Sequence, residues 1–123
     1  MKVLQASLIF LMAISASWNA KACMPPLPSE AFAREGRNVI IGKVDGASFV
    51  QNRNDAAPEM LIRIERLEIL SGKAPIVVTA VVPCAMPLAP GERVVVATFY
   101  GRRYVYPADM YEESFRNAHH RKR

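Results

Sequence analysis

The chain of 123 residues carries 16 lysines and arginines against 11 aspartates and glutamates, giving a formal net charge of +5, and 51% of its residues are hydrophobic. This length predicts one domain with a single core. No apolar run reaches the roughly 20 residues that a transmembrane helix needs. The basic residues gather at the C-terminal end (Arg116, Arg121, Lys122, Arg123) instead of covering one face, so no nucleic-acid partner is expected.

The first 22 residues have the organisation of a secretory signal peptide. Lys2 supplies the charged start, residues 3–14 are mostly apolar, and Ala20 and Ala22 stand at the two positions that a signal peptidase reads. Cleavage after Ala22 makes Cys23 the first residue of an exported protein, periplasmic or fully secreted, with a free α-amino group. A lipoprotein signal with an acyl anchor on Cys23 is the competing interpretation, although the residues just before Cys23 depart from such a signal.

The chain holds two cysteines, Cys23 and Cys84. In an exported protein such a pair indicates a disulfide more often than a metal site. Closing a loop of this length stabilises the folded chain by roughly 4 kcal/mol in the chain-entropy model. We therefore expect a Cys23–Cys84 disulfide.

The first elements after Cys23 are a stiff segment and a short helix. Three prolines at 25, 26 and 28 predict an extended segment. Ser29 then resembles the N-cap of a helix over 30–35 that stops at Gly36, with Phe32 as its core contact.

The middle of the chain predicts three strands. Residues 38–50 form the first, with Gly42 and Gly46 at bends, and the polar residues 51–58 are expected to form an exposed loop. The second strand, 60–70, alternates, and its apolar set changes parity near residues 65–66 as a bulge requires; a helix over 60–70 is the alternative. A turn over 71–74 leads to a third strand over 75–82.

The last third predicts two more strands and a helix. Three prolines stiffen a loop over 83–92, and the nearly continuous apolar run at 93–100 predicts a central strand. After a turn, residues 103–106 form a fifth strand, and a helix runs from 107 to about 117. The fold class is therefore mainly β, a five-stranded OB-type barrel with a short N-terminal helix and a short C-terminal helix. The domain is expected over 23–117, followed by a flexible basic tail over 118–123.

The order of these pieces resembles a known family. A mature N-terminal Cys and a proline-rich stretch precede Ser29-Glu30-Ala31-Phe32. A strand Val39-Ile40-Ile41-Gly42-Lys43-Val44, a long strand ending in Leu70-Ser71-Gly72, a second Cys and the run from Leu88 to Val96 follow. Together they resemble the netrin-like (NTR) module, and within it the N-terminal domain of the tissue inhibitors of metalloproteinases, over nearly all of residues 23–117.

The resemblance implies a protein-binding module that inhibits a zinc metalloprotease. By position, the backbone amine and carbonyl of Cys23 would chelate the zinc of the target enzyme, Met24 would enter its specificity pocket, and Cys84 would anchor Cys23. The remaining contact residues would be Pro25, Pro83, Ala85 and Met86. The family's inhibitors carry further disulfides, one of them through a Cys where this chain has Pro25, so family membership and inhibition are separate predictions.

The residues suggest no enzyme and no cofactor. No Cys–His–acid pattern falls in the expected core, and His119-His120 in a basic tail is expected to be solvated rather than metal-bound. Two alternatives to inhibition stay open. One is a non-inhibitory interaction domain of the envelope or the extracellular space. The other is an OB-type binder of glycan or nucleic acid that uses the aromatic residues of the last two strands, Phe99, Tyr100, Tyr104 and Tyr106.

Overall fold

The computed structural model describes residues 25–53 and 56–120. The predicted signal peptide, Cys23, Met24 and residues 121–123 lie outside the described residues, so the predictions made for them stay predictions.

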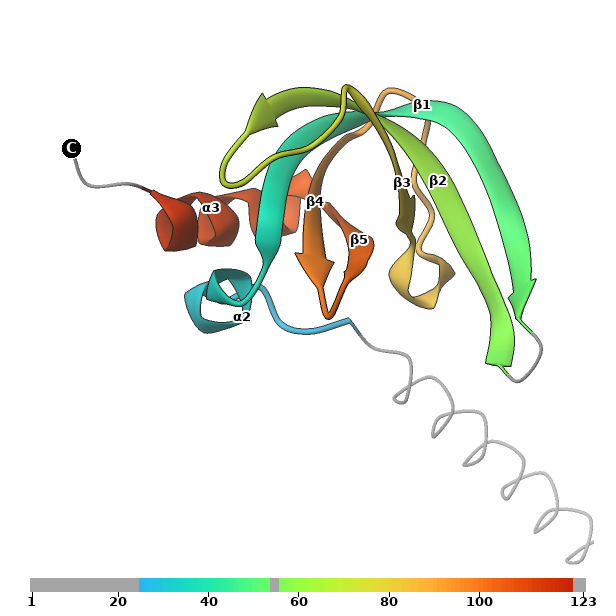
Figure 1. Cartoon of the computed structure of the whole chain (residues 1–123), viewed down its shortest axis with the longest axis horizontal. Helices are drawn as coiled ribbons and strands as arrows, with labels where there is room; N and C mark the ends of the chain where they lie inside the picture. The colour runs from blue at the N-terminus through green and yellow to red at the C-terminus, as the bar shows by residue number, and fades with distance from the viewer. Residues whose placement is uncertain (1–24, 54–55, 121–123) are drawn as a thin grey trace, which may run out of the picture.

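The described chain forms a closed five-stranded barrel with a helix near each end (Figure 1). Its strands are β1 (Arg37–Arg53), β2 (Ala56–Ile69), β3 (Val77–Val81), β4 (Arg93–Phe99) and β5 (Arg102–Pro107); its helices are α2 (Glu30–Arg34), the 3-10 turn η1 (Pro83–Ala85) and α3 (Ala108–His119). The strands close in the order β1-β2-β3-β5-β4, antiparallel except where β3 and β5 meet in parallel at Val81 and Tyr104. The predicted fold class, a mainly β barrel of OB type with two short helices, is confirmed.

The core has two layers that share strand β4. Val94 and Val96 belong to the cluster that fills the barrel, whereas Val95 and Ala97 belong to the cluster packed under the helices. All four side chains are buried, which explains why this strand reads as a continuous apolar run. The helix-facing layer also holds Phe115, so α3 covers the outside of the barrel.

The long hairpin of β1 and β2 bends at the predicted places. Its pairing shifts register between Ile41 and Gly42 and again between Val44 and Ser48. Ile41 pairs with Glu68 and Gly42 with Arg66, so Leu67 is the extra residue of a bulge, close to the predicted change of parity. The competing helix over 60–70 is excluded, because these residues form a strand.

The predicted loop over 51–58 is wrong. Strand β1 continues to Arg53 and β2 begins at Ala56. The hydrogen bonds that pair two strands are made by the backbone, so polar residues can form part of a hairpin as well as apolar ones. The polarity of this stretch therefore did not mark the end of the strands.

Helix α3 also runs further than predicted, to His119. The His119 ring is parallel to that of Phe115, with centroids 6.3 Å apart, and Nε2 donates to the carbonyl of Ala33 at 2.8 Å. The solvated state expected for His119 is therefore wrong, because α3 docks on α2 at this point.

Candidate functional site

The N-terminal segment, residues 25–29, is fixed by the far end of the chain. The hydroxyl of Tyr111 on α3 donates to the carbonyl of Pro26. Tyr111 is 2% exposed, and its burial raises the pKa of the phenol. The side chain of Ser29 accepts a hydrogen bond from the backbone N–H of Phe32 at 3.1 Å, which caps α2 as predicted. The chain that follows the expected mature N-terminus is therefore held at two points.

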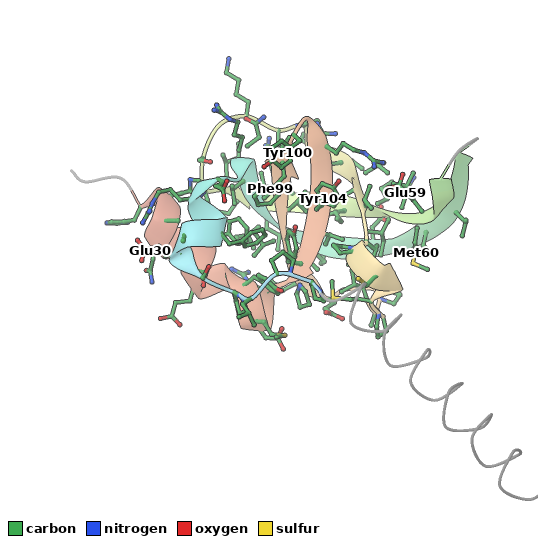
Figure 2. All side chains as sticks on the ribbon, turned by 90° about the horizontal axis from the view of Figure 1, so that it is seen from below. Glu30, Glu59, Met60, Phe99, Tyr100 and Tyr104 are labelled. Atoms are coloured by element: carbon green, nitrogen blue, oxygen red, sulfur yellow. The ribbon has the colours of Figure 1, made fainter. Side chains whose placement is uncertain are left out.

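The turn that carries Cys84 lies between β3 and β4. Cys84 is exposed and has a left-handed backbone, with φ 55° and ψ 25°, inside η1. It is a disulfide-bonded cysteine and not a free thiol. Its pairing with Cys23 stays a prediction, because that residue is outside the described part of the chain. In both views, residues 25–29 run below the barrel toward the side where η1 lies (Figures 1 and 2).

A groove opens beside this turn. It has a volume of about 510 Å³ and lies between the β1–β2 hairpin and the loop that links η1 to β4. Its apolar walls come from Val44, Met60 and Ile62 on one side and Met86, Leu88 and Pro90 on the other. The loop is fastened to β1 by two backbone bonds, from Val44 N–H to the carbonyl of Glu92 and from Gly91 N–H to the carbonyl of Val44.

The structure brings some of the predicted contact residues together. Pro83, Ala85 and Met86 share one turn, and the backbone N–H of Met86 donates to the carbonyl of Pro83 at 3.3 Å. Met86 is half-buried, packs against the barrel core and lines the groove, and its contact with a partner stays a prediction. Pro25 is half-buried at the start of the described chain.

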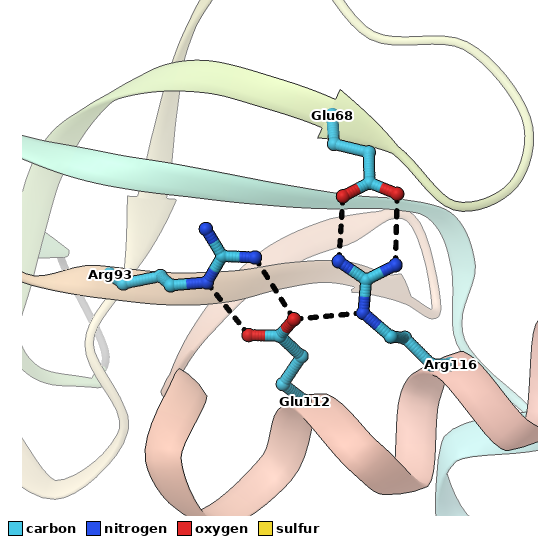
Figure 3. A network of polar contacts seen from close by, with 4 residues as sticks. All are labelled: Glu68, Arg93, Glu112 and Arg116. Atoms are coloured by element: carbon cyan, nitrogen blue, oxygen red, sulfur yellow. Dashed lines mark hydrogen bonds and ion pairs between the residues drawn. The ribbon is translucent and has the colours of Figure 1, made fainter.

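Two features were missed by reasoning from the sequence. The first is a cluster of ion pairs that joins α3 to the barrel (Figure 3). Arg93 makes two hydrogen bonds to Glu112, at 2.8 and 2.9 Å. Arg116 bonds Glu112 at 2.8 Å and Glu68 at 2.9 and 2.6 Å. The i, i+4 spacing of Glu112 and Arg116 was readable from the sequence, whereas their partners come from β2 and β4.

The arginines of this cluster lower the pKa values of its two carboxylates. The hydrogen bond from Arg93 lowers the pKa of Glu112 to about 2, and the hydrogen bond from Arg116 lowers the pKa of Glu68. The two carboxylates remain charged and fully engaged with guanidinium groups near neutral pH. We therefore assign the cluster a structural role, since a general acid or base needs a pKa near the operating pH.

The second missed feature is the full lining of a cavity beside the β4–β5 hairpin. The sequence singled out Phe99, Tyr100, Tyr104 and Tyr106, and these four side chains line one cavity of about 620 Å³. Glu35 and Arg37, which the sequence did not single out, line the same cavity. No local pattern could have joined them to it, because they arrive from the end of α2 and the start of β1.

Comparison of the chain with protein-family models, with curated proteins and with solved structures finds no match. Within residues 25–53 and 56–120, no group of three or more His, Cys, Asp and Glu side chains is placed to hold a metal ion. None of the helices in the described ranges is both long and apolar enough to cross a membrane.

Proposed function

We propose that this chain is an exported protein-binding module, similar to the NTR module, which binds its partner along the edge formed by its mature N-terminus, the Cys84 turn and the adjacent groove. The observation that supports this most directly is the hydrogen bond from Tyr111 to Pro26, which holds the N-terminal segment in an extended form. An ordered binding segment loses less conformational entropy when it meets its partner.

The apolar groove adds a second argument. Its loop wall contains prolines and is bonded to β1 through the backbone, so the surface is rigid. Rigid apolar surface bordered by polar groups is typical of protein interfaces.

The specific form of the proposal is inhibition of a zinc metalloprotease. An α-amine with a pKa of about 7.7–8.0 has a useful neutral fraction near neutral pH, and catalytic zinc keeps an open coordination position. The amine and carbonyl of Cys23 would occupy that position on the target enzyme, with Cys84 holding Cys23 in place. The metal belongs to the target, so this chain needs no cofactor of its own.

The test begins with the exported protein. Intact mass under non-reducing conditions establishes whether the chain starts at Cys23 with a free amine and a disulfide to Cys84. That chain is then assayed against a panel of zinc metalloproteases with fluorogenic peptides. The matched variant carries one extra Ala before Cys23, and the control carries the extra Ala at the C-terminus.

Inhibition by the control but not by the N-terminally extended chain supports the chelating form. Inhibition by neither, or by both equally, refutes it. A partner found for the module is then tested with Pro87→Glu and Ala89→Glu, two exposed groove positions, against Met110→Glu on α3, which adds the same charge outside the groove. Binding that survives both groove variants contradicts the proposed edge.

A further inference from the structure

The aromatic cavity at the other hairpin, between β4 and β5, is not used by the proposed function. Its wall is formed by Phe32 from α2 and by Phe99, Tyr100 and Tyr104 from the hairpin. Figure 2 shows Phe99, Tyr100 and Tyr104 close together. At about 620 Å³, the cavity falls within the range of small-molecule sites.

The requirements of folding do not explain why a tyrosine occupies position 100. Tyr100 and Gly101 form the two-residue turn of the hairpin, and both have positive φ, 52° and 80°. A turn with this backbone favours Asn-Gly or Asp-Gly, and a bulky residue is unfavourable there. The side chain is 99% exposed, so no burial offsets the strained backbone. An aromatic side chain placed at such cost and left in solvent points to a ligand.

The rest of the aromatic wall is rigid. Phe99 stacks on Phe32 with centroids 4.8 Å apart and planes 16° from parallel. Tyr104 lies against Phe99 at 6.5 Å, and Phe32 packs edge-on against the buried ring of Phe115 at 5.9 Å. The wall is therefore an outward extension of the core and is ordered before any ligand arrives.

Two charged side chains that have no partner among the described residues border this wall. Glu35 and Arg37 are exposed, and within the described part of the chain neither side chain makes a hydrogen bond or an ion pair. By contrast, Arg102, close to the same hairpin turn, is held by two bonds of 2.7 Å to Glu59. The cavity thus offers one carboxylate acceptor, one guanidinium donor and the hydroxyl of Thr98, with no net charge.

We propose that this cavity binds a neutral saccharide. The C–H face of a pyranose ring is apolar and can stack on Tyr100, while its hydroxyl groups can donate to Glu35 and accept from Arg37. A nucleic acid fits less well, because Arg37 is the one cation among the described residues that lines the cavity, and binding of a phosphate backbone depends on several. Glu35 would also repel a phosphate.

The test uses the purified mature chain, labelled with ¹⁵N, and a panel of probes. The saccharide probes are soluble oligomers of glucose, N-acetylglucosamine, mannose, galactose and xylose; oligo-dT and phosphocholine represent the other ligand chemistries. Binding of a saccharide should shift the amide resonances of residues 98–104 and 35–37. A chain in which no saccharide shifts them, or in which oligo-dT or phosphocholine binds there instead, overturns the proposal.

Variants separate binding from folding. Tyr100→Asn suits the turn better, so its melting temperature should stay equal or rise while saccharide affinity falls by about tenfold, the loss of one aromatic contact. Tyr100→Phe keeps the ring and should bind like the parent. Glu35→Gln and Arg37→Gln should each weaken binding several-fold without changing the melting temperature. Unchanged saccharide binding in Tyr100→Asn contradicts the assignment, and so does equal loss in Tyr100→Phe and Tyr100→Asn.

Discussion

Glu112→Gln tests how much the ion-pair cluster contributes to holding α3 on the barrel. The substitution keeps the shape of the side chain and one acceptor oxygen but removes the charge that Arg93 and Arg116 share. The pKa of Glu112 falls from its ordinary value of 4.5 to about 2, which corresponds to an upper bound of about 3 kcal/mol. The side chains of Arg93 and Arg116 are 49% and 38% exposed, so solvent screening reduces the expected loss to about 1–2 kcal/mol.

The contribution of Glu112 to the free energy of unfolding should change with pH in a defined direction. The pKa of Glu112 is lower in the folded chain than in the unfolded chain, so its contribution is complete above the unfolded pKa. The contribution then declines as the pH falls from about 5 toward 2 and the carboxylate becomes protonated. The parent and Glu112→Gln should therefore differ in free energy of unfolding at pH 7 and converge near pH 2.

Urea unfolding followed by circular dichroism measures this difference at each pH. At pH 7 the melting temperature of Glu112→Gln should also fall, by about 5–10 °C for a domain of this size. Glu113→Gln is the matched control, because Glu113 lies next to Glu112 on α3, is exposed and takes part in no ion pair among the described residues. Equal stability of parent and Glu112→Gln at pH 7, or a difference of the same size at pH 2, would refute the reasoning.

Three further predictions concern packing and order. Phe115→Ala removes a fully buried ring from the layer under the helices and should cost about 3–5 kcal/mol in chemical denaturation; a loss below about 1 kcal/mol would mean that the helices pack loosely. Gly42→Ala places a methyl group against Ile64 and 2.9 Å from the carbonyl of Glu65, so the midpoint of unfolding should drop, by about 1–3 kcal/mol in free energy, and an unchanged midpoint would contradict the close approach of β1 and β2. Tyr111→Phe removes the donor to Pro26 and should lower the free energy of unfolding by about 1 kcal/mol, measured by urea denaturation; unchanged stability would show that this bond does not hold the segment.

Local sequence patterns were sufficient for most of the barrel. The apolar run at 93–100 predicted a central strand, and β4 is buried on both faces. Ser29 predicted the start of α2, and the parity change in 60–70 predicted the bulge at Leu67. These features depend on residues a few positions apart in the sequence, so periodicity and capping chemistry predict them directly.

The length of the β1–β2 hairpin was not predictable in the same way. Backbone pairing carries β1 to Arg53 and starts β2 at Ala56, and backbone hydrogen bonds require no alternation of apolar side chains that the sequence would show. The packing of His119 on Phe115 could likewise not be predicted, because the sequence alone does not show that α2 lies against α3.

The sequence by itself determined the order of the strands and helices and most of their apolar positions, since those properties are largely local. Only the tertiary structure decided which charges meet and which aromatic rings share a cavity. Glu68, Arg93 and Glu112 come from three different elements, and Glu35 and Tyr100 lie far apart along the chain yet border one cavity. Contacts of this kind depend on how the barrel closes, because closure brings together residues whose spacing in the sequence carries no periodic signal.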